Sequence, residues 1–206
     1  MTENLEIKNG LTYSVIDGVS MGLKSGTYKE YFKNGNLAYI ANYKDGLLDG
    51  DTFHYYNSGK VAIKENYQSG HLKKHAEFDK YGFLKFGTET VESNKKVCYY
   101  CMKDEPISAG MMENDLKEGQ WMETKPDSSI CFKNYKHGIL NGSYRLIRFD
   151  KVLEKGYYKD GKLDSVRKIF NPKDGTKVEI KYQKGKIIYE KFYDSTGRIS
   201  HITKYQ

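Results

Sequence analysis

Residues 43–50 are Tyr-Lys-Asp-Gly-Leu-Leu-Asp-Gly, and residues 135–142 are Tyr-Lys-His-Gly-Ile-Leu-Asn-Gly. Both segments have the form aromatic-x-x-Gly-x-x-x-Gly, and this phrase recurs along the chain with some losses. The position of its first glycine falls at residues 22, 46, 70, 94, 115, 138, 161 and 185, with Asn at 94 and Asp at 115 in place of glycine. These positions are 21 to 24 residues apart, which indicates eight tandem copies of one structural unit.

A second turn signal follows in several units, at Asn34-Gly35, Ser58-Gly59, Asp150-Lys151, Asp174-Gly175 and Thr196-Gly197. Between the two signals apolar and polar residues alternate, for example over residues 37–43 and 61–67. Such alternation between Asn-Gly or Asp-Gly pairs predicts strand, turn, strand, turn. Each unit is therefore expected to be one β-hairpin, in which glycine supplies the positive φ of the turns.

The composition agrees with strands, because the 206 residues include 19 Tyr, 9 Phe and 20 Gly but only 3 Pro. A single hairpin is barely stable in water, so neighbouring hairpins must pair. We predict an all-β fold, one elongated single-domain meander of about eight tandem β-hairpins with negligible helix. Residues 1–18 and 189–206 are expected to cap the two ends, and residues 19–188 to form the repeats, which are irregular over 74–119.

The phrase Tyr43-Lys-Asp-Gly46-x-x-x-Gly50 resembles the membrane occupation and recognition nexus (MORN) repeat, a hairpin unit of similar length. The turn phrase over residues 31–37, Tyr-Phe-Lys-Asn-Gly-Asn-Leu, is similar to the bacterial MORN-repeat variant family, which includes YwqK-type antitoxin-like proteins. The resemblance extends over residues 19–205 and is weak between Lys74 and Gly110. It implies a twisted sheet of serial hairpins and a protein-binding module. Some members are thought to neutralise toxins, and some relatives associate with membranes or lipids. No catalytic residue belongs to the repeat.

The sequence itself contains no motif of an enzyme. A glycine-rich phosphate loop, a serine nucleophile elbow and a paired-acid motif are all absent. We therefore predict a non-enzymatic protein without a cofactor. There is no signal peptide and no run of about 18 apolar residues, which predicts a cytoplasmic protein without a transmembrane segment. The odd number of cysteines, 3, agrees with a reducing compartment.

Cys98-Tyr-Tyr-Cys101 is the one sequence that could be taken for a metal or redox motif, with Cys131 and His137 as further ligands. A chelating pair needs both sulfur atoms on one side, as in a turn or at the start of a helix. The repeat register instead places both cysteines in a strand, where residues three apart point to opposite faces. We therefore predict no metal site here.

Charge is unevenly distributed along the chain. From Lys133 to Gln206 there are 18 basic and 8 acidic residues, whereas residues 1–132 contain 16 and 19. This asymmetry has two interpretations: solubility of a sheet with two exposed faces, or attraction to a charged partner. Basic and aromatic residues also alternate, as in Lys191-Phe-Tyr193, which is expected to place aromatics on one face and lysines on the other.

Partner binding is predicted where the units differ most, because a regular hairpin presents the same surface at every unit. Tyr, Met and Trp dominate many protein interfaces. The candidate partner-binding residues are Tyr99, Tyr100, Met102, Met111, Met112 and Trp121. Two alternatives stay open: the irregularity is sequence drift, or Trp121 fills the core, since its register matches Tyr28 and Tyr144.

The predicted function is a non-enzymatic protein-binding module, in its specific form an antitoxin or immunity protein that neutralises a toxin by occlusion. The alternative is a peripheral module that binds anionic lipid or nucleic acid through the basic C-terminal third. The two differ in the salt dependence of binding.

Overall fold

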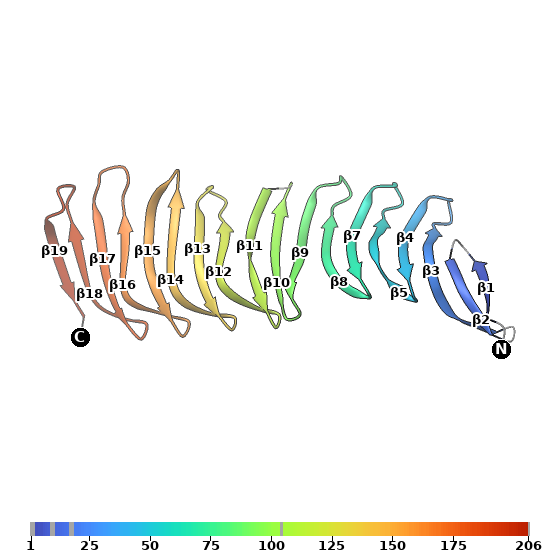
Figure 1. The fold of residues 1–206 in the computed structure, drawn as a ribbon. Helices are drawn as coiled ribbons and strands as arrows, with labels where there is room; N and C mark the ends of the chain where they lie inside the picture. Colours follow the sequence, from blue (N-terminus) through green and yellow to red (C-terminus); the bar gives the residue numbers. More distant parts are fainter. Residues whose placement is uncertain (1–2, 9–10, 17–18, 104, 206) are drawn as a thin grey trace. The chain divides into compact units, whose positions relative to one another are not determined.

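The computed structural model describes residues 3–8, 11–16, 19–103 and 105–205, and these form β-strands and no helix (Figure 1). The chain divides into two compact units, Met1–Glu105 and Pro106–Gln206. Within each unit, successive strands pair antiparallel in sequence order. The predicted all-β fold of tandem hairpins is thus confirmed, whereas the boundaries of the capping segments stay a prediction.

The strands of the first unit are β1 (Glu3–Lys8), β2 (Leu11–Ile16), β3 (Val19–Tyr31), β4 (Leu37–Lys44), β5 (Leu47–Leu48), β6 (Gly50–Tyr55), β7 (Val61–Gln68), β8 (His71–Phe78), β9 (Leu84–Glu92) and β10 (Lys95–Met102). The strands of the second unit are β11 (Glu105–Glu113), β12 (Leu116–Thr124), β13 (Ile130–Lys136), β14 (Ile139–Arg148), β15 (Lys151–Lys159), β16 (Lys162–Phe170), β17 (Lys177–Gln183), β18 (Lys186–Tyr193) and β19 (Ile199–Lys204). β11 begins one residue before the second unit does. No helix in the described part of the chain has the length and apolarity of a membrane span.

At Gly46 and Gly138 the first glycine of the repeated phrase forms a tight two-residue hairpin turn, whereas Gly22 lies within β3. Asp45 and Gly46 have φ values of 50° and 80°, and His137 and Gly138 have φ values of 50° and 79°. Two consecutive positive φ values are typical of the type I′ turn, whose twist matches that of the strands it joins. The predicted positive φ at this position is thus confirmed.

The second glycine of the phrase lies at a β-bulge. Gly142 has a φ of 116°, and the register between β13 and β14 shifts between Lys133 and Tyr135. A bulge puts two residues of one strand opposite one of its partner, and its extra residue often has the positive φ that favours glycine. The Gly-x-x-x-Gly spacing therefore encodes a turn followed by a bulge.

Replacing Gly138 with valine is expected to lower the free energy of unfolding by about 1–3 kcal/mol, because a β-branched residue resists its φ of +79°. Thermal or denaturant unfolding measures the change. Lys136→Val, at an exposed position at the end of β13, is the control and is expected to have little effect. An unchanged melting temperature in the Gly138 variant would contradict the turn assignment.

The second unit buries side chains on one face of its sheet. Trp121, Tyr144 and Ile180 are at most 7% exposed, and cross-strand pairing places the first two on one face through Lys133. We call this the core face. The opposite surface, which we call the open face, carries Phe132, Arg145, Lys155 and Lys168, each directly opposite the next across neighbouring strands.

Candidate functional site

The predicted residues of the first unit lie on β10. Tyr99 is half-buried and packs on Gly87 of β9, where an added Cβ would meet the tyrosine ring. Tyr100 is 41% exposed and its ring lies 4.8 Å from that of Phe86. Met102, at 64% exposed, is the most accessible of the three. Tyr100 and Met102 are therefore available to a partner, whereas Tyr99 is largely committed to packing.

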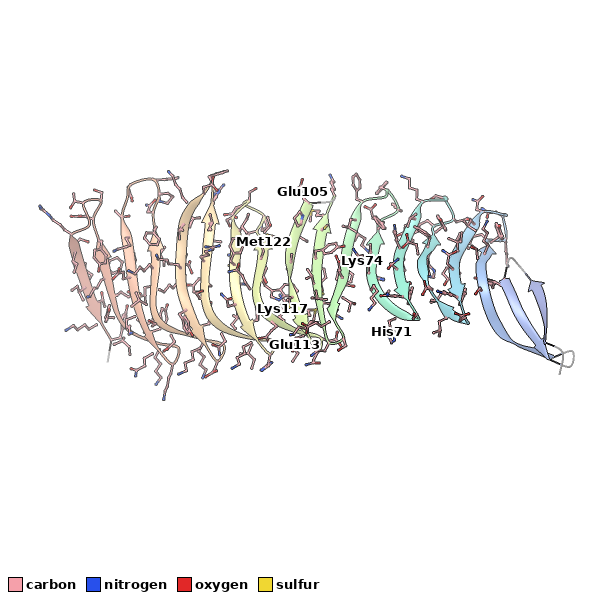
Figure 2. The ribbon with its side chains drawn as sticks, viewed as in Figure 1. His71, Lys74, Glu105, Glu113, Lys117 and Met122 are labelled. Carbon is pink, nitrogen blue, oxygen red and sulfur yellow. The ribbon has the colours of Figure 1, made fainter. Side chains whose placement is uncertain are left out.

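The predicted residues of the second unit lie on β11 and β12. Met111 and Met112 are half-buried. Trp121 is only 1% exposed, and its indole Nε1 donates a hydrogen bond to the carbonyl of Met111 at 2.8 Å. Lys117 Nζ lies 4.3 Å from the centre of the Trp121 ring; Figure 2 shows this lysine near the turn of the β11–β12 hairpin. Trp121 thus fills the core, which is the second of the two alternatives for this residue.

Cys98 and Cys101 both lie in β10, as the repeat register predicts. The Cys98 side chain is buried and that of Cys101 is half-buried. Residues three apart in a strand point to opposite faces, so this segment does not present two sulfur atoms to one ion. Across the described residues, no group of three His, Cys, Asp or Glu side chains is arranged to hold a metal.

Two glutamates of the second unit are held by several donors. Glu154 accepts hydrogen bonds from Arg167 Nε and Nη2 at 3.0 and 2.9 Å and from the Tyr144 hydroxyl at 2.6 Å. Burial alone would raise the pKa of Glu154, but these bonds outweigh it and lower the pKa. Bonds from Lys168, Tyr193 and Lys177 likewise outweigh burial and lower the pKa of Glu179 to about 2. These carboxylates are fully engaged, so they support the sheet and are poor candidates for proton transfer.

The open face of the second unit carries a row of basic side chains. Arg145 on β14 lies directly opposite Lys155 on β15, which lies opposite Lys168 on β16. Like charges directly opposite one another destabilise a sheet. Lys168 is neutralised by Glu179 at 3.0 Å, but within the described ranges Arg145 and Lys155 make no ion pair. This basic row therefore costs stability that an acidic ligand would recover.

Aromatic side chains share the open face with these cations. Arg145 lies 4.7 Å from the centre of the Phe132 ring, and Lys177 Nζ lies 3.8 Å from that of Tyr193. The expectation that alternation separates lysines from aromatics is therefore wrong here. Residues two apart share a face, so Lys191 lies between Tyr189 and Tyr193, and Phe192 points to the other side.

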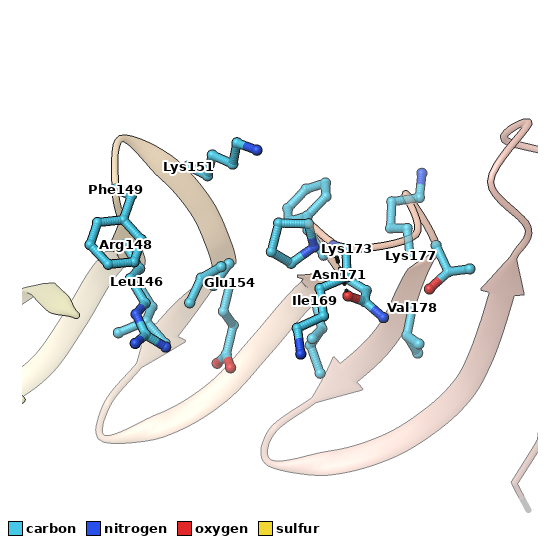
Figure 3. A pocket seen from close by; sticks show the side chains of 14 residues that line it. Leu146, Arg148, Phe149, Lys151, Glu154, Ile169, Asn171, Lys173, Lys177 and Val178 are labelled. Atoms are coloured by element: carbon cyan, nitrogen blue, oxygen red, sulfur yellow. Dashed lines mark hydrogen bonds between the residues drawn. The ribbon is translucent and has the colours of Figure 1, made fainter. Parts of the chain in front are cut away.

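The second unit also contains a hollow of about 680 Å³, which we call the cup (Figure 3). It lies between the turn that joins β14 to β15 and the loop that joins β16 to β17. Its apolar lining includes Leu146, Phe149, Leu153, Ile169, Pro172 and Val178. Its basic lining consists of Arg148, Lys151, Lys173 and Lys177. Apolar hollows of this size with a few polar groups are typical of binding sites.

The turn beside the cup holds an aromatic residue in a strained backbone conformation. Phe149 and Asp150 have φ values of 47° and 59°, so phenylalanine occupies a position of the type I′ turn that favours glycine or asparagine. Such a conformation costs on the order of 1–3 kcal/mol. The Phe149 side chain is nevertheless 79% exposed, so its burial offers no compensation. Strain without a packing benefit is typical of a functional position.

Arg148 contributes to the cup a donor atom, its buried Nε, that lacks a hydrogen-bond partner among the described residues. The nearest carboxylate oxygen, of Asp127, lies 3.8 Å from Nη1, and the guanidinium carbon lies 5.2 Å from the centre of the Phe149 ring. A buried donor without a partner costs about 1–3 kcal/mol. The Arg148 side chain as a whole is 41% exposed, so the rest of its guanidinium is open to a carboxylate in the cup.

Comparison with known families identifies part of the first unit. Residues 24–45 and 48–69 each match the family model described as the MORN repeat variant. These two segments are similar to the MORN repeat variant. Each contains strands and turns of the tandem hairpins described above. MORN repeats are generally protein- or membrane-binding modules and are not enzymatic. No curated protein matches the sequence significantly.

Sequence reasoning predicted the turn at Asp150-Lys151 but missed the cup beside it. A signal was present at Phe149-Asp150, where other hairpin repeats have Asn-Gly or Ser-Gly. The unpartnered Arg148 atom and the hollow itself depend on how two neighbouring hairpins pack. No local pattern reports that packing.

Proposed function

We propose that the chain is a non-enzymatic protein-binding module, and that it acts as an antitoxin or immunity protein by covering the active surface of a partner toxin. The observation that carries this proposal is the basic row Arg145, Lys155 and Lys168 on the open face of the second unit. Two like-charged pairs in direct register favour a partner surface rich in carboxylates. The MORN matches agree with a binding role.

The charge of each unit agrees with this assignment. Residues 1–105 contain 14 basic and 14 acidic side chains, whereas residues 106–206 contain 20 and 13. The whole net charge of +7 therefore belongs to the second unit. Electrostatic complementarity of this kind accelerates association with an acidic partner and helps to exclude wrong ones.

Anionic lipid or nucleic acid is the second candidate ligand, because the same cations would pair with phosphates. The aromatic rings favour the protein partner. Arg145, Lys177 and Lys191 lie over the rings of Phe132, Tyr193 and Tyr189, and a ring covered by a cation does not offer that face for base stacking.

Co-expression with the product of the reading frame next to its gene tests the antitoxin proposal. We expect the chain to restore growth that this product arrests. Arg145→Glu combined with Lys155→Glu is expected to abolish the rescue and to weaken the purified complex by about 2 kcal/mol or more. Lys159→Glu combined with Lys184→Glu, at exposed positions away from the basic row, changes the net charge equally and is expected to preserve the rescue.

A further pair tests the surface predicted from sequence in the first unit. If Tyr100→Ala with Met102→Ala abolishes the rescue and the basic-row pair does not, the partner binds the first unit. A single-stranded oligonucleotide or a vesicle with anionic lipid that binds more tightly than any protein, with steep weakening by salt, would support the second candidate.

A further inference from the structure

The cup on the second unit combines three features: an open apolar hollow, an exposed aromatic side chain, Phe149, at a turn position with positive φ, and a donor atom of Arg148 without a hydrogen-bond partner among the described residues. They occur together at one end of the β14–β15 hairpin. Each costs stability in the unbound protein, so a ligand that satisfies all three is favoured. Its chemistry follows from the lining.

The basic lining specifies negative charge in that ligand. Lys151 and Lys173 form no ion pair within the described ranges. Lys177 Nζ forms an ion pair with Glu179 Oε1 at 3.1 Å. Glu154 is the one acidic lining residue. Its carboxylate already accepts bonds from Arg167 and Tyr144 and points away from the turn that carries Phe149 and Lys151 (Figure 3).

The exposed ring of Phe149 indicates a ligand larger than a small molecule. Phe149 lines the cup, and its side chain is nevertheless 79% exposed. A small ligand confined to the cup would leave most of this surface in water, whereas a polypeptide that crosses the rim would cover it.

We propose that the cup binds an acidic segment of a protein partner. An aromatic or aliphatic side chain of the segment enters the hollow and contacts Phe149, and flanking carboxylates pair with Arg148, Lys151 and Lys173. This inference rests on the proposed protein-binding function and assigns a second contact, separate from the basic row on the open face.

Binding of a labelled peptide to the full chain tests the inference. The probe is a fluorescein-labelled nine-residue peptide with one central phenylalanine and two glutamates on each side, measured by fluorescence anisotropy. We expect saturable binding, and none when the phenylalanine is alanine or the glutamates are lysines.

Phe149→Gly separates a binding role from a structural one. Glycine relieves the positive φ, so we expect the melting temperature to stay the same or rise while peptide affinity falls by about tenfold. A lower melting temperature with unchanged affinity would overturn the inference, because Phe149 would then serve the fold.

Charge reversal at the two ends of β15 provides a matched pair. Lys151 and Lys159 are both exposed and are the first and last residues of this strand, but only Lys151 lines the cup. Lys151→Glu is expected to weaken peptide binding by about tenfold and Lys159→Glu by less than about twofold. Equal weakening by both would overturn the inference, because it would show attraction to net charge alone.

Laurate, an acyl carboxylate without a peptide, is the competing probe. If it binds the cup and displaces the peptide at lower concentration, the occupant is a lipid anion and the inference is wrong. If Phe149→Gly and Lys151→Glu leave rescue of growth intact while the basic-row pair abolishes it, the cup is not a contact and the proposed function still stands.

Discussion

Replacing Gly110 with alanine is expected to lower the free energy of unfolding of the second unit by about 3 kcal/mol, the upper part of the range for overpacking a filled core. Gly110 lies directly opposite Trp121 in the β11–β12 pair. A Cβ at Gly110 would lie 2.3 Å from Cδ2 of the indole. Because the indole is buried and bonded to the Met111 carbonyl, it cannot move aside without losing that bond. Denaturant unfolding measures the loss.

Gly119→Ala is the matched control for this variant. Gly119 has a φ of +65° and nothing within 4 Å of an added Cβ, so its cost is confined to the backbone and is expected to be about 1 kcal/mol. In a background with Trp121→Leu, the further cost of Gly110→Ala should shrink, since the clashing ring is gone. Equal costs at Gly110 and Gly119 in the native background would contradict the packing described here.

Replacing Arg167 with methionine is expected to lower the free energy of unfolding by about 3 kcal/mol at neutral pH. The change leaves the Glu154 carboxylate without its two guanidinium bonds in a site where Glu154 is 20% exposed. The double variant Glu154→Leu with Arg167→Met should recover most of the loss, because an apolar pair replaces a charged pair without leaving an isolated charge. Failure to recover would mean that Arg167 matters for packing alone.

The effect of Arg167→Met should depend on pH in a definite direction. In the native protein the pKa of Glu154 is lowered, so the pair stabilises the fold above the unfolded-state pKa of about 4.3, and this stabilisation is lost as pH falls through the lower folded-state pKa. In the variant, the guanidinium bonds no longer oppose burial, so the pKa of Glu154 is higher than in the native protein. The difference in stability between the two proteins should therefore be largest near neutral pH and shrink in acid.

The fold could be predicted from sequence because its signals are local. Gly46 and Gly138 mark type I′ turns and Gly142 marks a bulge, and each of these depends on the φ of one or two residues. The strand that holds Cys98 and Cys101 followed from the same register. Repetition strengthened each weak signal, since a turn that lacks its glycine in one hairpin can be located from the spacing of the neighbouring hairpins.

The candidate site could be predicted only in part. Tyr100 and Met102 are exposed, but Trp121 is core, and composition alone does not decide which aromatic residue of a thin sheet is buried. Residues two apart in a strand share a face, as Tyr189, Lys191 and Tyr193 do, so the aromatic and basic side chains of the open face were wrongly separated. The cup depends on packing between two hairpins, and its clearest sequence signal is Phe149 in a turn.

The sequential pairing of strands within each unit has a consequence for how such chains form. In the described part of the chain, the strand pairs with the most contacts are neighbours in sequence, so most contacts join residues close in sequence and the entropy of closing long loops is kept small. Folding can start at any hairpin and spread to its neighbours. For the same reason, duplication of one hairpin during evolution lengthens the sheet without disturbing distant residues. A single altered turn, such as that of Phe149, can acquire a new role while the other turns keep theirs.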